Sequence, residues 1–73
     1  MDNLRIILRS LRQVIGQEPS LIVMNYPTFH ENEGKPTYYG VPVILDMKSK
    51  TDVIFYLFDD KRVLKPILYA SVE

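Results

Sequence analysis

The residues that could bind a metal or transfer a proton are few in this chain. His30, Glu31 and Glu33 form the one cluster of ligand-type side chains, in a polar stretch between Pro27 and Pro36. A catalytic zinc site needs a third strong ligand and a defined scaffold, and loop residues at this spacing supply neither. We therefore interpret the cluster as a solvated acidic loop and expect no metal ligand.

Paired carboxylates and nucleophiles are no better placed for catalysis. Asp59 and Asp60 are adjacent, so they would point to opposite faces of a strand or bond the local backbone of a turn. The serines lie far in sequence from His30, and none sits in a Gly-x-Ser-x-Gly elbow. A fold of 73 residues also leaves little room for a pocket of about 300 Å³ or more. We expect no catalytic residue and no cofactor; a hydrolase or metal enzyme around His30 is the alternative.

The composition limits the classes of partner. Hydrophobic residues make up 47% of the chain, and nine basic side chains balance nine acidic ones. This neutrality gives no overall electrostatic drive towards nucleic acid or an anionic membrane. Cysteine is absent, which excludes disulfides and cysteine–zinc sites. Since small domains often need an additional source of stability, we expect oligomerisation or a partner more readily than usual. Without a signal peptide or an apolar run of ~20 residues, we expect a cytoplasmic protein.

Residues 2–15 have the pattern of an amphipathic helix. Six apolar residues recur at spacings that place them on one face of a helix: Leu4, Ile7, Leu8, Leu11, Val14 and Ile15. Asp2 or Asn3 can cap the start, Gly16 can end the helix and Pro19 prevents it from resuming. Ile6 lies off the apolar face, where we expect it to be half exposed or to contact a partner.

The rest of the chain favours strands. Residues 20–26 predict a short, deeply buried strand, and residues 27–36 predict a loop containing one helical turn that Thr28 caps. Residues 37–47 alternate, with Tyr39, Val41, Val43, Leu45 and Met47 towards the core; Pro42 indicates an edge or bulged strand. Residues 52–58 are the candidate central strand, and residues 63–72 a last edge strand containing Pro66.

These elements predict one α+β domain over residues 1–73. Its N-terminal amphipathic helix packs on a three- to four-stranded, mostly antiparallel sheet. We expect a meander in which the proline-free strand, residues 52–58, lies between two strands that contain prolines.

Two groups of residues are candidates for contact with a partner. Arg5, Arg9 and Arg12 recur at i, i+4 and i+7 and form a ridge well away from the apolar helix face. Tyr38, Tyr56 and Tyr69 belong to predicted strands, and Tyr38 and Tyr39 are adjacent, so one of these two must face away from the core. Outward tyrosines on a sheet can anchor a protein interface or stack bases. The lysines are scattered among acidic residues, which favours the protein interface.

The middle of the chain also resembles a known pattern. After the helix come a Pro-x-x-Ile-Val-Met segment with a following Pro-Thr, a Tyr-Gly-Val-Pro-Val strand, and an apolar strand ending in acidic residues. The matching positions are Pro19, Leu21 to Met24, Pro27, Thr28, Tyr39 to Val43, Asp46 and Phe55 to Asp59. This pattern is similar to the peripheral-domain segment of tailed-phage major capsid proteins and small phage-encoded relatives. The resemblance implies an α+β fold and a phage or prophage source, and it transfers no catalytic or binding residue.

The leading hypothesis is a small non-catalytic protein-interaction module. Its partner would be a host protein that it inhibits or modulates, a virion protein, or a second copy of the chain. If the chain is phage-encoded, its place is the host cytoplasm. The alternative is a nucleic-acid-binding accessory protein that uses Arg5, Arg9 and Arg12 on the helix.

Overall fold

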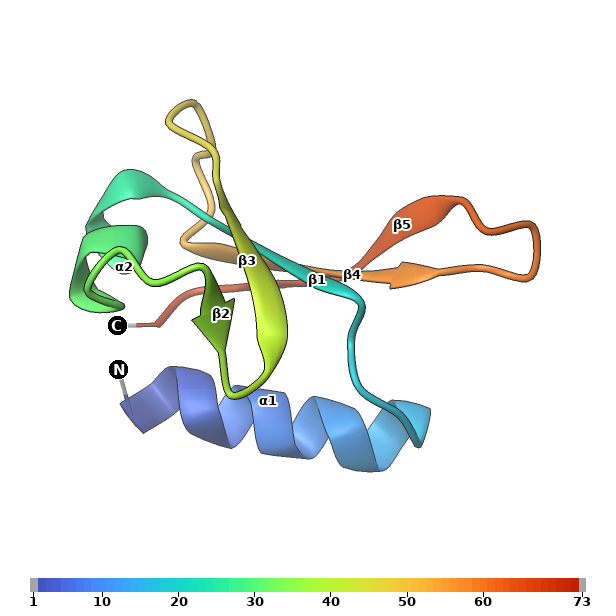
Figure 1. Ribbon diagram of the computed structural model, residues 1–73. Coiled ribbons are helices and arrows are strands. Elements are labelled where there is room, and N and C mark those ends of the chain that lie inside the picture. The colour runs from blue at the N-terminus through green and yellow to red at the C-terminus, as the bar shows by residue number, and fades with distance from the viewer. Residues whose placement is uncertain (1, 73) are drawn as a thin grey trace.

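The computed structural model describes residues 2–72 as two helices and five strands (Figure 1). In chain order these are α1 (Asp2–Ile15), β1 (Leu21–Met24), α2 (Tyr26–Glu31), β2 (Thr37–Tyr38), β3 (Val41–Leu45), β4 (Val53–Phe58) and β5 (Leu64–Ala70). The predicted α+β class and N-terminal helix are confirmed. Among residues 2–72, neither helix has the length and apolar character needed to cross a bilayer.

Helix α1 packs its apolar side against one face of the sheet. Leu4, Leu8 and Leu11 are buried, and Asn3 Nδ2 donates to the Val72 carbonyl at 3.4 Å. The helix ends at Ile15, and the next residue, Gly16, has a φ of 72° and donates its N–H to the Arg12 carbonyl at 2.9 Å. The left-handed conformation that closes the last turn favours glycine.

The sheet is mixed and has five strands in the order β2-β3-β1-β4-β5. β1 lies at the centre, parallel to β3 and antiparallel to β4, with Ile22 opposite Val43 and Phe55. The predicted three- to four-stranded meander is therefore wrong, because β1 separates β3 from β4. A short strand that is apolar on both faces gains most from this central place, where it has a strand on each side.

The β2–β3 hairpin is the second correction. Tyr38 pairs with Val41, and the two residues between them, Tyr39 and Gly40, have φ values of 48° and 84°. Positive φ at both central positions is the signature of a type I′ turn. The strand with Pro42 is consequently not an edge, since the two-residue β2 lies outside it. Tyr39 belongs to the turn and is exposed, contrary to its predicted place in the core.

The outer strand β5 is an edge, as its proline predicts. The register shifts between Phe55 and Tyr56, which lie opposite Leu68 and Pro66, so Ile67 is an extra, bulged residue. At the far end of the sheet, Met47 lies in the β3–β4 loop and is 67% exposed, so its predicted core position is also wrong.

Helix α2 occupies the predicted polar loop but begins earlier than expected. Its N-cap is Asn25, whose side chain accepts from the Thr28 N–H at 3.1 Å. Thr28 was the predicted cap; instead it is buried, with 2% of its surface exposed. Pro27 fits the first turn of α2, where no intrahelical partner for its missing N–H is required.

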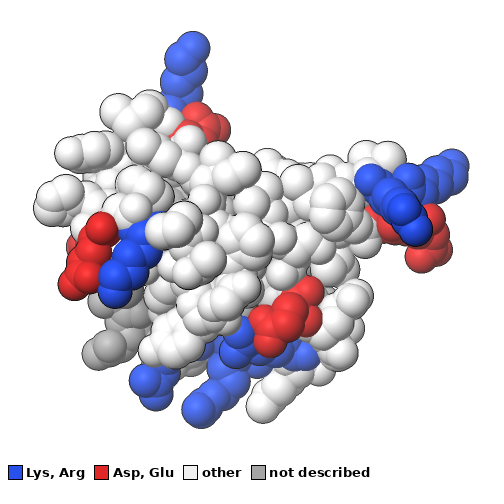
Figure 2. Space-filling view, viewed as in Figure 1, with Lys and Arg blue, Asp and Glu red and all other residues white. Residues whose placement is uncertain are grey.

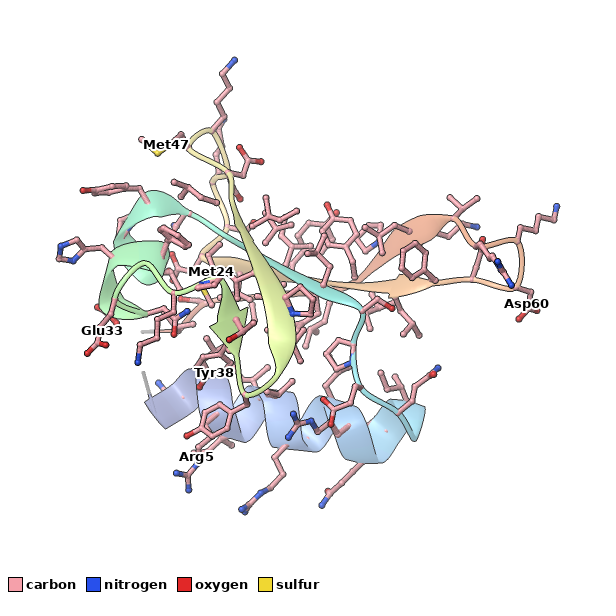
Figure 3. The ribbon with its side chains drawn as sticks, viewed as in Figure 1. Arg5, Met24, Glu33, Tyr38, Met47 and Asp60 are labelled. Atoms are coloured by element: carbon pink, nitrogen blue, oxygen red, sulfur yellow. The ribbon has the colours of Figure 1, made fainter. Side chains whose placement is uncertain are left out.

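The core lies between α1 and the sheet. Phe55, Ile22, Met24 and Val53 have no exposed surface and come from the two central strands β1 and β4. In Figure 3, Met24 and Tyr38 point into the space between the sheet and α1. Residues 2–72 therefore form two layers, with α1 on one side of the sheet and no helix on the other (Figure 1).

Candidate interaction surface

The second face of the sheet has no helix over it among the described residues (Figure 1). Strand alternation places on this face the side chains that point away from α1. We call this surface the open face, and define it by Leu21, Val23, Pro42, Ile44, Ile54, Tyr56, Phe58, Leu64, Pro66 and Tyr69. Its residues come from four strands, so their positions are fixed by the sheet rather than by loops.

Large apolar side chains of the open face are exposed to solvent. Ile44, Phe58 and Tyr69 are 52%, 55% and 60% exposed. Between them, Ile54 is only 9% exposed, because its neighbours on the face cover it. The middle of the open face, at Ile54, is therefore covered. Ile44, Phe58 and Tyr69, on three different strands, are its exposed anchors.

Charge is almost absent from the sheet. In the five strands only Lys65 carries a formal charge, and its Nζ lies 3.2 Å from Asp59 Oδ2. The backbone N–H of Val63 and then Lys65 hold the pKa of Asp59 below its ordinary value. Figure 2 shows charged side chains along the α1 side and at the tips of the hairpins, with an uncharged area between them.

Two of the predicted contact residues lie on the open face. Ile54 pairs with Tyr69 and Tyr56 pairs with Pro66, so Tyr56 and Tyr69 are brought together on adjacent strands. Tyr69 is exposed and Tyr56 is half-buried. These two tyrosines form the aromatic part of the face together with Phe58, which the sequence analysis did not select.

The third predicted tyrosine, Tyr38, belongs to β2, and its side chain is buried between the sheet and α1 (Figure 3). Only 7% of its surface is exposed, and its ring meets that of Tyr39 edge-on at a centroid distance of 4.8 Å. Tyr39 is the member of this pair that faces solvent, with 57% of its surface exposed. Tyr38 therefore has little surface that a partner could contact. The type I′ turn instead turns the neighbouring residue, Tyr39, towards solvent.

The three predicted arginines lie on the helix, across the molecule from the open face. Arg5 and Arg9 are exposed, and Figure 3 shows Arg5 pointing away from the sheet. Arg12 is held in place: its guanidinium lies 2.7 Å from Glu18 Oε2 and donates to the Tyr39 carbonyl at 3.2 Å. The structure therefore does not join the arginines and the outward tyrosines into one surface.

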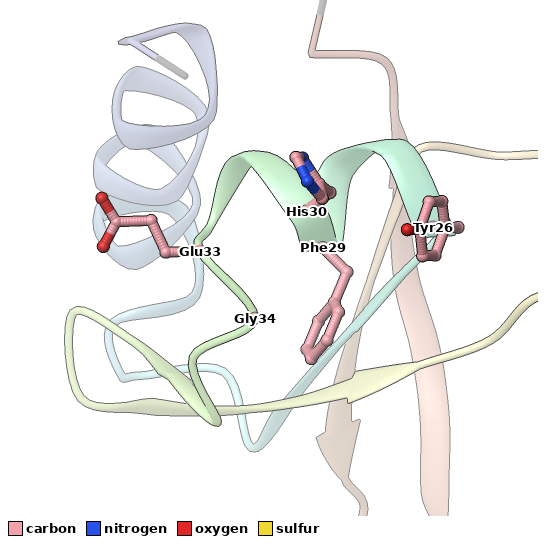
Figure 4. Close-up of a pocket in the computed structure, with 5 residues that line it drawn as sticks. All are labelled: Tyr26, Phe29, His30, Glu33 and Gly34. Carbon is pink, nitrogen blue, oxygen red and sulfur yellow. The ribbon is translucent and has the colours of Figure 1, made fainter.

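Of the predicted His30 cluster, His30 and Glu33 line a shallow depression beside α2 (Figure 4). Its volume is about 490 Å³, and the ring centroids of Tyr26 and His30 are 6.1 Å apart. Tyr26, Phe29 and Gly34 complete its lining. Among the side chains of residues 3–72, no three histidines or carboxylates gather as a metal site would require.

The signal that locates the open face was present in the sequence. The strand segments contain almost no charge on either alternating set, whereas a sheet with one face in water alternates apolar and polar residues.

Comparisons of the chain with protein-family models, with curated proteins and with solved structures find no match.

Proposed function

We propose that this protein is a non-catalytic interaction module that binds another protein through the open face. One observation carries the proposal: the sheet is apolar on both faces, yet the described chain supplies a helix for one of them. Sheets of this composition are ordinarily covered on both sides. A partner protein would supply the missing layer.

The chemistry of the face supports a protein partner. Protein interfaces are depleted of charge at their centre and enriched in aromatic side chains. The open face has this composition, with Tyr56, Phe58 and Tyr69 on two neighbouring strands and no charged side chain. Each exposed anchor is already about half covered, so burying its remaining surface would contribute about 1 kcal/mol before the cost of association. The partner must therefore bring a flat, apolar surface of its own.

Nucleic acid is the second candidate, and a different surface favours it. Arg5 and Arg9 are exposed on α1 and make no ion pair with the side chains of residues 3–72. Such a contact would weaken steeply with added salt. Failure of the purified protein to shift single- or double-stranded DNA at low ionic strength would eliminate this candidate.

The biological setting belongs to the same proposal. The resemblance to the peripheral segment of phage capsid proteins supports a phage or prophage source. A host-protein inhibitor and a virion component both work by surface contact, so the open face serves either role.

Site-specific photocrosslinking in the producing cell tests the proposal. A benzophenone amino acid replaces Tyr69 or Phe58 on the open face, and replaces Arg9 on the helix in the control. We expect one discrete adduct from both open-face positions, lost when Ile44→Lys is added and kept when Arg5→Ala is added. The mass of the adduct distinguishes a second copy from another protein. No adduct from the open face, or the same adduct from position 9, would overturn the proposal.

A further inference from the structure

Tyr39 lies against the flank of α1 that carries the three arginines. With 3.6 residues per turn, Arg5, Arg9 and Arg12 fall within an arc of about 60° on the helix surface. Arg12 donates to the Tyr39 carbonyl at 3.2 Å, so the β2–β3 turn lies beside this arc. In Figure 2, basic side chains gather along α1. We call this surface the arginine flank and define it by Arg5, Arg9, Arg12 and Tyr39.

The fold itself does not account for Arg5 and Arg9. Both are exposed, and neither is ion-paired with a side chain of residues 3–72. Arg9 lies four residues after Arg5 and three before Arg12, and like charges at these spacings destabilise a helix. Arg5 also lies in the first turn of α1, where the helix dipole favours negative charge. Conflicts of this kind are expected at functional sites, and a bound anion would relieve both.

Arg12 and Tyr39 are held in place on the same flank. The Arg12 Nε donates to Glu18 Oε2 at 2.7 Å, while its Nη2 donates to the Tyr39 carbonyl. The Tyr39 ring meets that of Tyr38 edge-on at 4.8 Å, and the backbone of Tyr39 is fixed by the type I′ turn. Even so, 57% of the Tyr39 surface is exposed. The flank therefore combines a pre-positioned aromatic ring with two exposed guanidinium groups.

We infer that the arginine flank binds a short stretch of single-stranded nucleic acid, with phosphates on Arg5 and Arg9 and a base stacked on Tyr39. Guanidinium groups bind phosphate oxygens through two parallel N–H donors. An exposed aromatic ring stacks on any base of a single strand, whereas the bases of a duplex are already stacked on each other. An acidic peptide is the poorer occupant, because its carboxylates would leave the Tyr39 ring without a matching contact.

This site rests on nucleic-acid binding, the second candidate function, and is separate from the open face. Tyr56 and Tyr69 lie on the opposite side of the sheet, whereas Tyr39 lies on the side of α1. A substitution on the arginine flank therefore leaves the surface that the photocrosslinking experiment tests unchanged.

Fluorescence anisotropy with four labelled probes tests the site. The probes are a ten-nucleotide oligothymidylate, an abasic strand with the same number of phosphates, a DNA hairpin with a stem of ten base pairs, and a peptide of ten glutamates. The full chain is titrated into each probe at salt concentrations between about 20 and 200 mM. The abasic strand keeps the phosphates and removes the bases, so it isolates the contribution of stacking.

Two pairs of variants separate stacking and charge from folding. Tyr39→Asn removes the ring but creates the Asn-Gly pair that type I′ turns favour, so the turn is kept, and Tyr39→Phe keeps the ring. Arg9→Gln removes one charge from the flank. Lys61→Gln removes one charge from the β4–β5 turn and is the matched control.

We expect the oligothymidylate to bind at least fivefold more tightly than each of the other three probes. Tyr39→Asn should weaken its binding at least fivefold, and Tyr39→Phe should restore it. Two phosphate contacts predict a slope of about −1.4 for the logarithm of the binding constant against that of the salt concentration. Arg9→Gln should halve this slope to about −0.7, and Lys61→Gln should leave it unchanged.

Three results would overturn the inference and show what replaces it. Equal binding of the abasic strand or the hairpin, with no effect of Tyr39→Asn, would leave nucleic-acid binding but remove the stacking site. Tighter binding of the glutamate peptide would indicate an acidic protein segment instead. No binding of any probe at low salt would remove the second candidate function as well.

Discussion

Asn25 and Asp52 are joined by two hydrogen bonds, one through the backbone and one through the side chains. The Asn25 N–H donates to the Asp52 carbonyl at 3.1 Å, and Asn25 Nδ2 donates to Asp52 Oδ1 at 3.0 Å. Asn25 also caps α2, and Asp52 immediately precedes β4. The pair thus fixes the start of the second helix against the start of a central strand.

Asp52 extends this connection to the end of the chain. Its Oδ2 accepts from the Val72 N–H and from Ser71 Oγ, both at 3.1 Å. The Val72 N–H, the Asn25 side chain and Ser71 together lower the pKa of Asp52 against a smaller opposing effect of burial. One carboxylate therefore holds together segments from three regions of the sequence.

The lowered pKa of Asp52 predicts loss of stability in acid. A carboxyl whose pKa falls on folding stabilises the fold fully above its unfolded pKa of about 4, and this contribution is lost as pH falls through the folded pKa. We expect Asp52→Asn to cost about 1 kcal/mol at pH 7 and to flatten the decline between pH 5 and pH 2. Urea unfolding at stepped pH measures this, with Asp60→Asn as the control. An unchanged pH profile in Asp52→Asn would contradict the assignment.

Asn25→Asp separates the capping role of Asn25 from its bond to Asp52. Aspartate keeps the acceptor for the Thr28 N–H, but it removes the Nδ2 donor and places a second carboxylate against Asp52. Since aspartate caps helices as well as asparagine does, a pure capping role predicts little change. We expect instead a loss of about 1–2 kcal/mol at pH 7 that shrinks at pH 4, where protonation relieves the repulsion. Asn25→Ser, which also caps, is the comparison.

The sequence predicted those elements that depend only on the pattern of neighbouring residues. Helix α1 was predicted with its observed bounds because its apolar period, the glycine after it and the proline beyond all agree. The buried strand at β1 and the proline-bearing edge β5 followed from composition in the same way.

The order of the strands could not be predicted in this way. The place of β1 between β3 and β4 depends on pairing between segments about 20 to 35 residues apart, which no local pattern encodes. The same limit explains why one predicted contact residue, Tyr38, was wrong. Whether Tyr38 or Tyr39 faces outward depends on the turn type, because a type I′ turn places Tyr39 outside the strand.

An uncovered face predicts that exposed apolar residues can be changed without unfolding. Ile44→Lys should change the free energy of unfolding by no more than about 0.5 kcal/mol and raise solubility, because Ile44 is 52% exposed in the free protein. Ile54→Lys on the same face should cost at least about 3 kcal/mol, because Ile54 is 9% exposed and the charge would be buried. Chemical denaturation of both variants makes the comparison. Similar losses in the two would mean that another layer covers Ile44.

The turn between β2 and β3 gives a test that depends on backbone geometry alone. Gly40 has a φ of 84°, and a Cβ built there meets no atom within 4 Å. L-alanine should therefore cost about 1 kcal/mol through its conformation and not through a clash. D-alanine prefers positive φ and restricts the unfolded chain, so it should stabilise the protein by about 0.5 kcal/mol. Total synthesis of the 73-residue chain gives both versions for thermal unfolding. Equal melting temperatures for the two would contradict a type I′ turn at Tyr39 and Gly40.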